Sequence, residues 1–250
     1  MSKKVFKNSF FYMFASFLPT IVGFLMLPIY SRFLLPTDYG VVALVLSLQA
    51  FLPLIMSLQI HTSISRFYFD YKSDKERLNI FVSSIFFLVF ILSTMIFIIL
   101  LVYLDEIISF VFSKTLGYNN IFLLGAITSY IAIFNTIFMS LLRVQQKAKL
   151  FMKASIFLFL VSLIVHIIEI VILKKGAYGV IEAALLTVCL NFILYAYLVR
   201  EFFVFKLDFK MILPSVRYSI PLIPHSLSGL IFMYSDRIIL EKYVTLSMIG

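Results

Sequence analysis

Long apolar stretches alternate with short polar segments along the whole chain. Each stretch is close to the roughly 20 residues that an α-helix needs to cross the hydrocarbon core of a bilayer. The pattern therefore predicts an all-α, polytopic membrane protein with about seven transmembrane helices. The predicted spans are 9–35, 41–65, 80–104, 121–142, 153–173, 179–199 and 219–244.

The basic residues between these spans fall mainly on one side of the predicted membrane. Fifteen of the 21 Lys and Arg residues share the side of the N-terminus, and the remaining six are Arg32, Lys114, Lys174, Lys175, Arg237 and Lys242. Because short basic segments stay in the cytoplasm, the N-terminus is expected to be cytoplasmic. The chain is 62% hydrophobic, so its net charge of +9 leaves no soluble basic face for nucleic acid.

The first apolar stretch follows Lys3, Lys4 and Lys7, as the core of a secretory signal would. It is longer than the roughly 7–15 residues of such a core and has no small-x-small cleavage site, so it predicts a retained helix. The single cysteine, Cys189, lies inside the sixth predicted span. One cysteine excludes an internal disulfide and a cysteine metal cluster.

Helix-breaking residues lie inside the first two predicted spans: Pro19, Gly23 and Pro28 in the first and Pro53 in the second. Breaks at membrane depth leave backbone carbonyls that neighbouring helices, water or a cavity must satisfy. Polar residues also gather on the second span, namely Gln49, Gln59, His61, Thr62, Ser63 and Ser65. Two interpretations stay open: simple packing kinks, or broken helices that face a hydrated interior.

Residues 200–210 mix aromatic and charged side chains and predict an amphipathic helix at the membrane surface, which Pro214 should end. We expect a six-helix lobe over residues 1–199, a cytoplasmic interfacial linker over 200–218 and the first helix of a second lobe over 219–250. A thin internal similarity at an offset of 210 residues, which pairs Gly40 with Gly250, fits the repeats common in transporters. On this interpretation the second lobe is incomplete in this chain.

Four segments carry a recognisable combination of residues. They are Asn8-Ser9 with Pro28 to Gly40, ending in Pro36-Thr37-Asp38-Tyr39-Gly40; Ser65-Arg66-Phe67-Tyr68-Phe69; Leu142-Arg143-Val144-Gln145-Gln146-Lys147; and Tyr218 to His225 leading to Ser235-Asp236-Arg237. Together they resemble the flippases for lipid-linked polysaccharide repeat units, whose superfamily also holds multidrug and toxin extrusion antiporters. The first and last segments are fairly specific to this group.

The resemblance implies alternating access between two lobes in the bacterial cytoplasmic membrane. A polyprenyl-pyrophosphate-linked oligosaccharide would be taken up at the cytoplasmic face and released outside, to supply O-antigen of lipopolysaccharide or capsule. The implied partners are this lipid-linked oligosaccharide, membrane lipids, and a polysaccharide polymerase and glycosyltransferases. No cofactor is implied.

The candidate substrate-binding residues are Arg32, Arg66, Asp236 and Arg237. Arginine offers permanently charged, forked donors that match the oxygens of a pyrophosphate. An unpaired cation in a membrane helix costs about 2.5–3.5 kcal/mol on insertion scales, so Arg32 and Arg237 should each face a partner or water. Asp236 could pair with a cation on another helix. The alternative for both arginines is anchoring at the membrane interface.

Other ionisable residues allow two interpretations. His166 and Glu169 are three residues apart on one helical face and could form a proton-responsive pair. Glu169, Glu182, Lys174 and Lys175 all lie near the outer ends of the fifth and sixth predicted spans, which favours an interfacial charge cluster.

Alternative functions remain. A cation-coupled antiporter of the same fold needs a carboxylate inside the first lobe, but the first two spans hold no Asp or Glu before Asp38 in their connecting loop. A membrane enzyme acting on polyprenyl-linked sugars needs convergent acid and base groups. The twelve acidic residues and three histidines form no such motif. A non-transporting scaffold is the third alternative.

Overall fold

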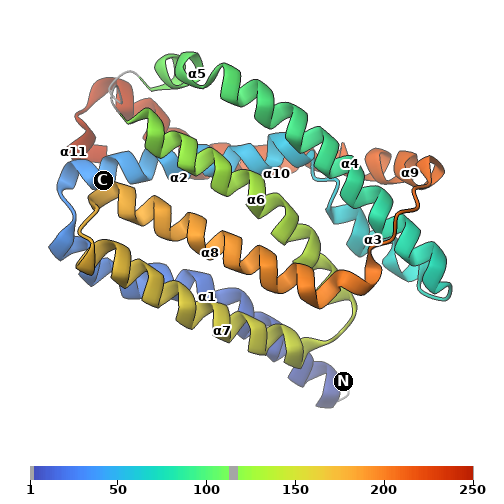
Figure 1. Ribbon diagram of the computed structural model, residues 1–250. Helices are drawn as coiled ribbons and strands as arrows, with labels where there is room; N and C mark the ends of the chain where they lie inside the picture. Colours follow the sequence, from blue (N-terminus) through green and yellow to red (C-terminus); the bar gives the residue numbers. More distant parts are fainter. Residues whose placement is uncertain (1–2, 113–117, 250) are drawn as a thin grey trace.

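The computed structural model describes residues 3–112 and 118–249, and within these residues the chain forms helices and no strand. Lys114 and Gly250 lie outside the described residues. The long helices lie side by side in an elongated bundle (Figure 1). The predicted all-α, polytopic membrane fold is confirmed.

Among the described residues, six helices are long and apolar enough to cross a membrane. They match the first six predicted spans and are α1 (Lys3–Phe33), α2 (Pro36–Ser57), α4 (Lys75–Val102), α6 (Asn119–Val144), α7 (Ala148–Ile167) and α8 (Gly176–Val199). The other helical elements are α3 (Thr62–Tyr71), α5 (Leu104–Val111), the π-helix η1 (Ile168–Ile172), the 3-10 turn η2 (Arg200–Phe202), α9 (Phe209–Ser219), α10 (Leu222–Tyr243) and α11 (Leu246–Ile249). The end of the bundle that holds the α1–α2 turn is called the outer end below, and the opposite end the inner end.

The seventh predicted span corresponds to α10, which has the length of a membrane helix but is not among the six candidates. Its polar residues, including His225, Asp236 and Arg237, make it less apolar than the other six. The helix runs along α2 (Figure 1). Thus α10 packs on another helix, and its own composition does not identify it as a membrane span.

The bundle is built around α6, which packs against α2 on one side and α8 on the other, while α1 packs against α7. On α6 the side chains of Phe122, Ile137 and Leu141 are fully buried. The many exposed apolar side chains of α1 and α4 instead face outward, as expected for surfaces that meet lipid. The core therefore lies along one central helix.

Of the two interpretations left open for the prolines, the one in which they break the first two spans is wrong. Both α1 and α2 continue as α-helix past their prolines, because each proline removes only one backbone donor and packed neighbours tolerate the loss. The second span breaks further on, where Leu58 and Gln59 adopt positive φ values of 45° and 58°. The hydroxyl of Thr62 then donates to the carbonyl of Gln59 at 2.7 Å and starts α3.

The prediction of an amphipathic helix over residues 200–210 is also wrong. Within this segment Arg200–Phe202 form a helical turn, the chain then runs as non-helical backbone to Asp208, and α9 begins at Phe209. The Asp208 carboxylate accepts a hydrogen bond from the Lys210 amide at 2.8 Å and caps α9. Pro214 does not end the segment, since α9 continues through it to Ser219.

Polar side chains on α4 explain why this linker is extended. Ser83 Oγ accepts from the Val204 amide at 2.9 Å, and Ser84 Oγ accepts from the Asp208 amide at 2.9 Å. Asn79 donates to the carbonyl of Glu201 at 3.1 Å. These bonds satisfy backbone groups that a helix would otherwise satisfy internally. The linker is consequently fastened to α4.

Candidate functional site

Arg32 lies in the last turn of α1, at the outer end, with its side chain exposed. Among the residues whose side chains are described, no carboxylate lies within ion-pair distance of it. A cation there interacts favourably with the negative end of the helix dipole. Arg32 is therefore a stable cation that is available to an external anion.

The motif that follows Arg32 joins three segments at the outer end. The Asp38 carboxylate accepts a hydrogen bond from the Leu35 amide at 3.0 Å and so closes the α1–α2 turn. It also lies against Gly176, the first residue of α8, where an added Cβ would be 3.2 Å from Oδ2. An added Cβ at Gly40 would collide with the backbone carbonyl of Leu246. The residues Pro36 to Gly40 thus have a structural role.

Asp236 and Arg237 lie in the second half of α10. The Asp236 carboxylate accepts from the Arg237 amide at 2.8 Å, and no ion pair joins it to a described cation on another helix. The Arg237 guanidinium is half-buried and lies 6.0 Å from the ring centroid of Tyr234. Tyr234 in turn contacts Phe51 of α2, with ring centroids 6.4 Å apart. Arg237 is thereby held beside α2 by aromatic contacts.

Arg66 lies on α3 at the inner end and already has a partner. Its guanidinium pairs with the Asp70 carboxylate at 3.5 Å, one helical turn away, and both side chains are half-exposed. It also lies 5.2 Å from the ring centroid of Phe67, which packs against Tyr218 of α9. Such an exposed pair is weak, so an anionic ligand can compete for Arg66.

The structure does not bring the four candidates into one site. Arg32 precedes α2 and Arg66 follows it, and the 22 residues of α2 rise by about 33 Å. Arg237 is only six residues from the outer end of α10, which corresponds to about 9 Å. Because Tyr234, one turn before Arg237, contacts Phe51 in the inner half of α2, Arg237 lies near the middle of the bundle, whereas Arg32 lies at the outer end and Arg66 at the inner end.

A cavity of about 180 Å³ with several polar lining residues lies between α1, α6, α7 and α8. Pro19 of α1 lines it, as one of the two interpretations of the prolines expected, but the residues that α6, α7 and α8 contribute were not predicted. Its polar lining residues are Ser16, Arg143, Ser155, Ser162, Thr187, Asn191 and Tyr195. The Oδ1 atom of Asn191 is buried and has no hydrogen-bond partner in the protein, which makes it a site for a water molecule. The seven-residue spacing of Ser155 and Ser162 could have indicated this polar lining, because it places both side chains on one face of the helix.

An ion-pair cluster closes the outer end of α7. Glu169 is buried in the π-helix η1 and pairs with Lys175 at 2.7 Å, and Lys175 also pairs with Glu182 of α8 at 2.8 Å. His166 contacts the carbonyl of Ser162 at 2.8 Å through Nδ1. The predicted charge cluster is confirmed for Glu169, Lys175 and Glu182. Glu169 is nevertheless far more buried than a residue at the membrane interface.

Comparison with known families agrees with this architecture. The family described as "Polysaccharide biosynthesis protein" matches the chain over residues 5–250. No curated protein and no solved structure matches the chain. Because the match covers nearly all of the sequence, this multi-pass membrane protein belongs to the polysaccharide biosynthesis protein family.

Proposed function

We propose that this protein translocates polyprenyl-pyrophosphate-linked oligosaccharide repeat units across the bacterial cytoplasmic membrane, as a transporter and not as an enzyme. The products serve the biosynthesis of O-antigen or capsule, beside the polymerase and glycosyltransferases of the same pathway. Family membership and the six described helices that are long and apolar enough to cross a membrane support the proposal. The observation that carries it is Arg237, a half-buried guanidinium on α10 with no carboxylate partner among the described side chains.

A pyrophosphate group is the anion that best fits such an arginine. Guanidinium presents two parallel N–H donors to phosphate oxygens and keeps its charge at every physiological pH. Arg32 lies just before the start of α2, at the outer end, and Arg237 lies deeper in the bundle, one turn from Tyr234, which contacts Phe51 of α2. Together they offer two positive charges between the middle of the bundle and the outer end, where a lipid-linked head group would be released.

The separation along α2 suggests an order of contacts. A head group at the inner end would meet Arg66 first, by displacing the weak pair with Asp70. It would meet Arg32 and Arg237 only after the protein has switched from the state that is open to the cytoplasm to the state that is open to the outside. Asp236 has an exposed carboxylate, which suits hydrogen bonds from sugar hydroxyl groups. One set of arginines thus serves loading and the other serves release.

Substitution of Arg32 and Arg237 in the natural gene tests the proposal. Arg237→Ala and Arg32→Ala should abolish surface polysaccharide and leave the amount of membrane-inserted protein unchanged. The lysine variants should retain part of the export, because lysine keeps the charge but loses the forked geometry. Accumulation of lipid-linked repeat units on the cytoplasmic side would identify translocation as the blocked step.

Arg217→Ala is the matched control, since Arg217 is exposed on α9 and makes no ion pair with a described residue. It should export polysaccharide at the normal rate. Normal export by both alanine variants at Arg32 and Arg237 would contradict the proposed substrate contacts. Full rescue by lysine would instead support interfacial anchoring.

A cation-coupled antiporter of the same fold is the second candidate, and the buried carboxylate of Glu169 favours it. Lys175 neutralises this carboxylate at present, so a coupling cation would have to replace the lysine. Glu169→Gln should then abolish cation-driven efflux of small molecules from vesicles. Unchanged efflux in that variant, or the absence of efflux in the wild-type protein, would exclude this candidate.

A further inference from the structure

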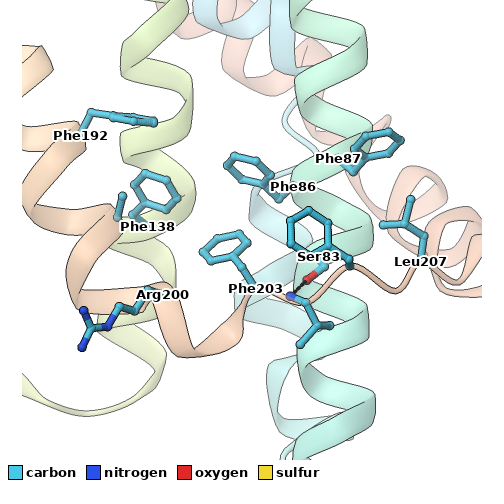
Figure 2. A pocket seen from close by; sticks show the side chains of 11 residues that line it. Ser83, Phe86, Phe87, Phe138, Phe192, Arg200, Phe203 and Leu207 are labelled. Atoms are coloured by element: carbon cyan, nitrogen blue, oxygen red, sulfur yellow. Dashed lines mark hydrogen bonds between the residues drawn. The ribbon is translucent and has the colours of Figure 1, made fainter.

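An aromatic groove runs along the side of the bundle, on the inner half of α4, α6 and α8. Its inner section has a volume of about 480 Å³ and its continuation toward the membrane centre about 430 Å³. The two sections share Phe86 and Phe192 and therefore form one groove. In Figure 2 the rings of Phe86, Phe138, Phe192 and Phe203 gather between the three helices.

The extended linker forms one wall of this groove. Phe203, Phe205 and Leu207 come from the linker, and the hydrogen bond from the Val204 amide to Ser83 holds it in place. The side chain of Phe205 is fully exposed. An open groove with an aromatic lining on the side of a membrane protein suits hydrocarbon chains better than water.

The only permanent charge in the lining belongs to Arg200, at the inner end of α8. Its guanidinium lies 4.3 Å from the ring centroid of Tyr197 and extends away from the cluster of rings (Figure 2). Among the described side chains it makes no ion pair, whereas the neighbouring Glu201 pairs with Lys147 at 3.3 Å. Arg200 is thus a cation at the mouth of an apolar groove, without an acidic partner.

The length of the groove identifies its occupant. Cys189, Ile193, Ala196 and Arg200 follow one face of α8 and line the groove from its deep end to its mouth. Eleven residues separate Cys189 from Arg200, which is a rise of about 16 Å. Half of a hydrocarbon core is about 15 Å thick. The groove therefore matches the depth of a single leaflet, which a phospholipid acyl chain fills and a polyprenyl chain exceeds.

We propose that this groove binds an anionic phospholipid of the cytoplasmic leaflet, with one acyl chain along the phenylalanines and the phosphate on Arg200. The excess of basic residues on the same side of the protein attracts anionic lipids to this leaflet. The bound lipid would cover the linker wall and stabilise its packing on α4. This site does not depend on the proposed transport function.

Lipid titration of the purified chain, followed by native mass spectrometry, tests whether the charge of Arg200 contributes to lipid binding. The probes are phosphatidylglycerol, phosphatidylethanolamine and polyprenyl phosphate. The wild-type chain should retain phosphatidylglycerol in preference to phosphatidylethanolamine. Arg200→Ala should lower this preference about fivefold, the effect of one basic residue at an anionic membrane surface. The control Arg217→Ala should leave it unchanged.

The groove itself is tested by filling it. Ala196→Phe should remove one tightly bound phospholipid, whereas Leu190→Phe, on the same helix but outside the lining, should not. A phosphatidylglycerol with a photoreactive group near the end of its acyl chain should label residues close to Cys189 in the wild-type chain. Displacement of phosphatidylglycerol by equimolar polyprenyl phosphate, an unchanged lipid preference in Arg200→Ala, or labelling scattered over the bundle would each overturn the proposal.

Discussion

Gly125 of α6 and Val45 of α2 meet where the two helices approach so closely that an added Cβ on Gly125 would lie 2.6 Å from Cγ1 of Val45. Beside this contact, Gln49 donates from Nε2 to the carbonyl of Gly125 at 3.2 Å. Helices in a membrane gain little from the hydrophobic effect, so close packing at small residues and interhelical hydrogen bonds stabilise their association. The contact between Gly125 and Val45 therefore fixes how α2 sits on the central helix.

Gly125→Ala should destabilise the bundle, because the added methyl group forces α2 and α6 apart. Overpacking of this kind costs about 1–3 kcal/mol. The melting temperature of the purified protein in detergent measures the effect. Gly23→Ala is the matched control, since nothing lies within 4 Å of a Cβ at that position. The combination of Gly125→Ala with Val45→Ala should recover much of the loss, and an unchanged melting temperature in Gly125→Ala alone would contradict the packing.

The double variant Ser83→Ala, Ser84→Ala should release the linker from α4. Each lost hydrogen bond is worth about 0.5–1.5 kcal/mol, so exchange of the Val204 and Asp208 amides should accelerate about fivefold or more. Hydrogen exchange measured by mass spectrometry reports this directly. Ser93→Ala is the control, because Ser93 bonds only to Phe90 in its own helix. Equal exchange in the wild-type protein and the double variant would show that the linker is held by other contacts.

Lys175→Met should destabilise the outer end of the bundle, because it leaves the buried carboxylate of Glu169 without its cation. Adding Glu169→Gln to this variant should restore part of the lost stability, since no buried charge then remains. Thermal unfolding of the two single variants and the double variant measures the coupling. Lys174→Met, at an exposed neighbouring position, serves as the control.

The same ion pairs determine the pH dependence of this region. Hydrogen bonds with Glu169 and Glu182 raise the pKa of Lys175 above its usual value. A raised pKa in the folded state stabilises the fold below the pKa of the unfolded state, and the stabilisation is lost as the pH rises through the folded value. The difference in stability between the wild-type protein and Lys175→Met should therefore be constant near neutral pH and shrink in strongly alkaline solution. A difference that stays unchanged through strongly alkaline solution would contradict this assignment.

The sequence by itself determined the fold class and the first six spans. Hydrophobic length is a local property, and a membrane leaves the backbone little choice but to form helices. It also indicated the charge cluster around Glu169, because residues near the ends of neighbouring helices have few alternative partners. The family resemblance rested on the same local segments, and the match over residues 5–250 agrees with it.

Only the tertiary structure decided where the second span breaks, how the linker runs and which residues share a site. Pro53 failed to break α2, while Leu58 and Gln59 broke it, because packing on neighbouring helices outweighs local preference. The linker is extended since Ser83 and Ser84 supply its hydrogen bonds from another helix. Arg32 and Arg66 are similar in type but lie at opposite ends of α2. The sequence specifies the chemical type of each side chain, whereas the distance between side chains depends on how the helices pack.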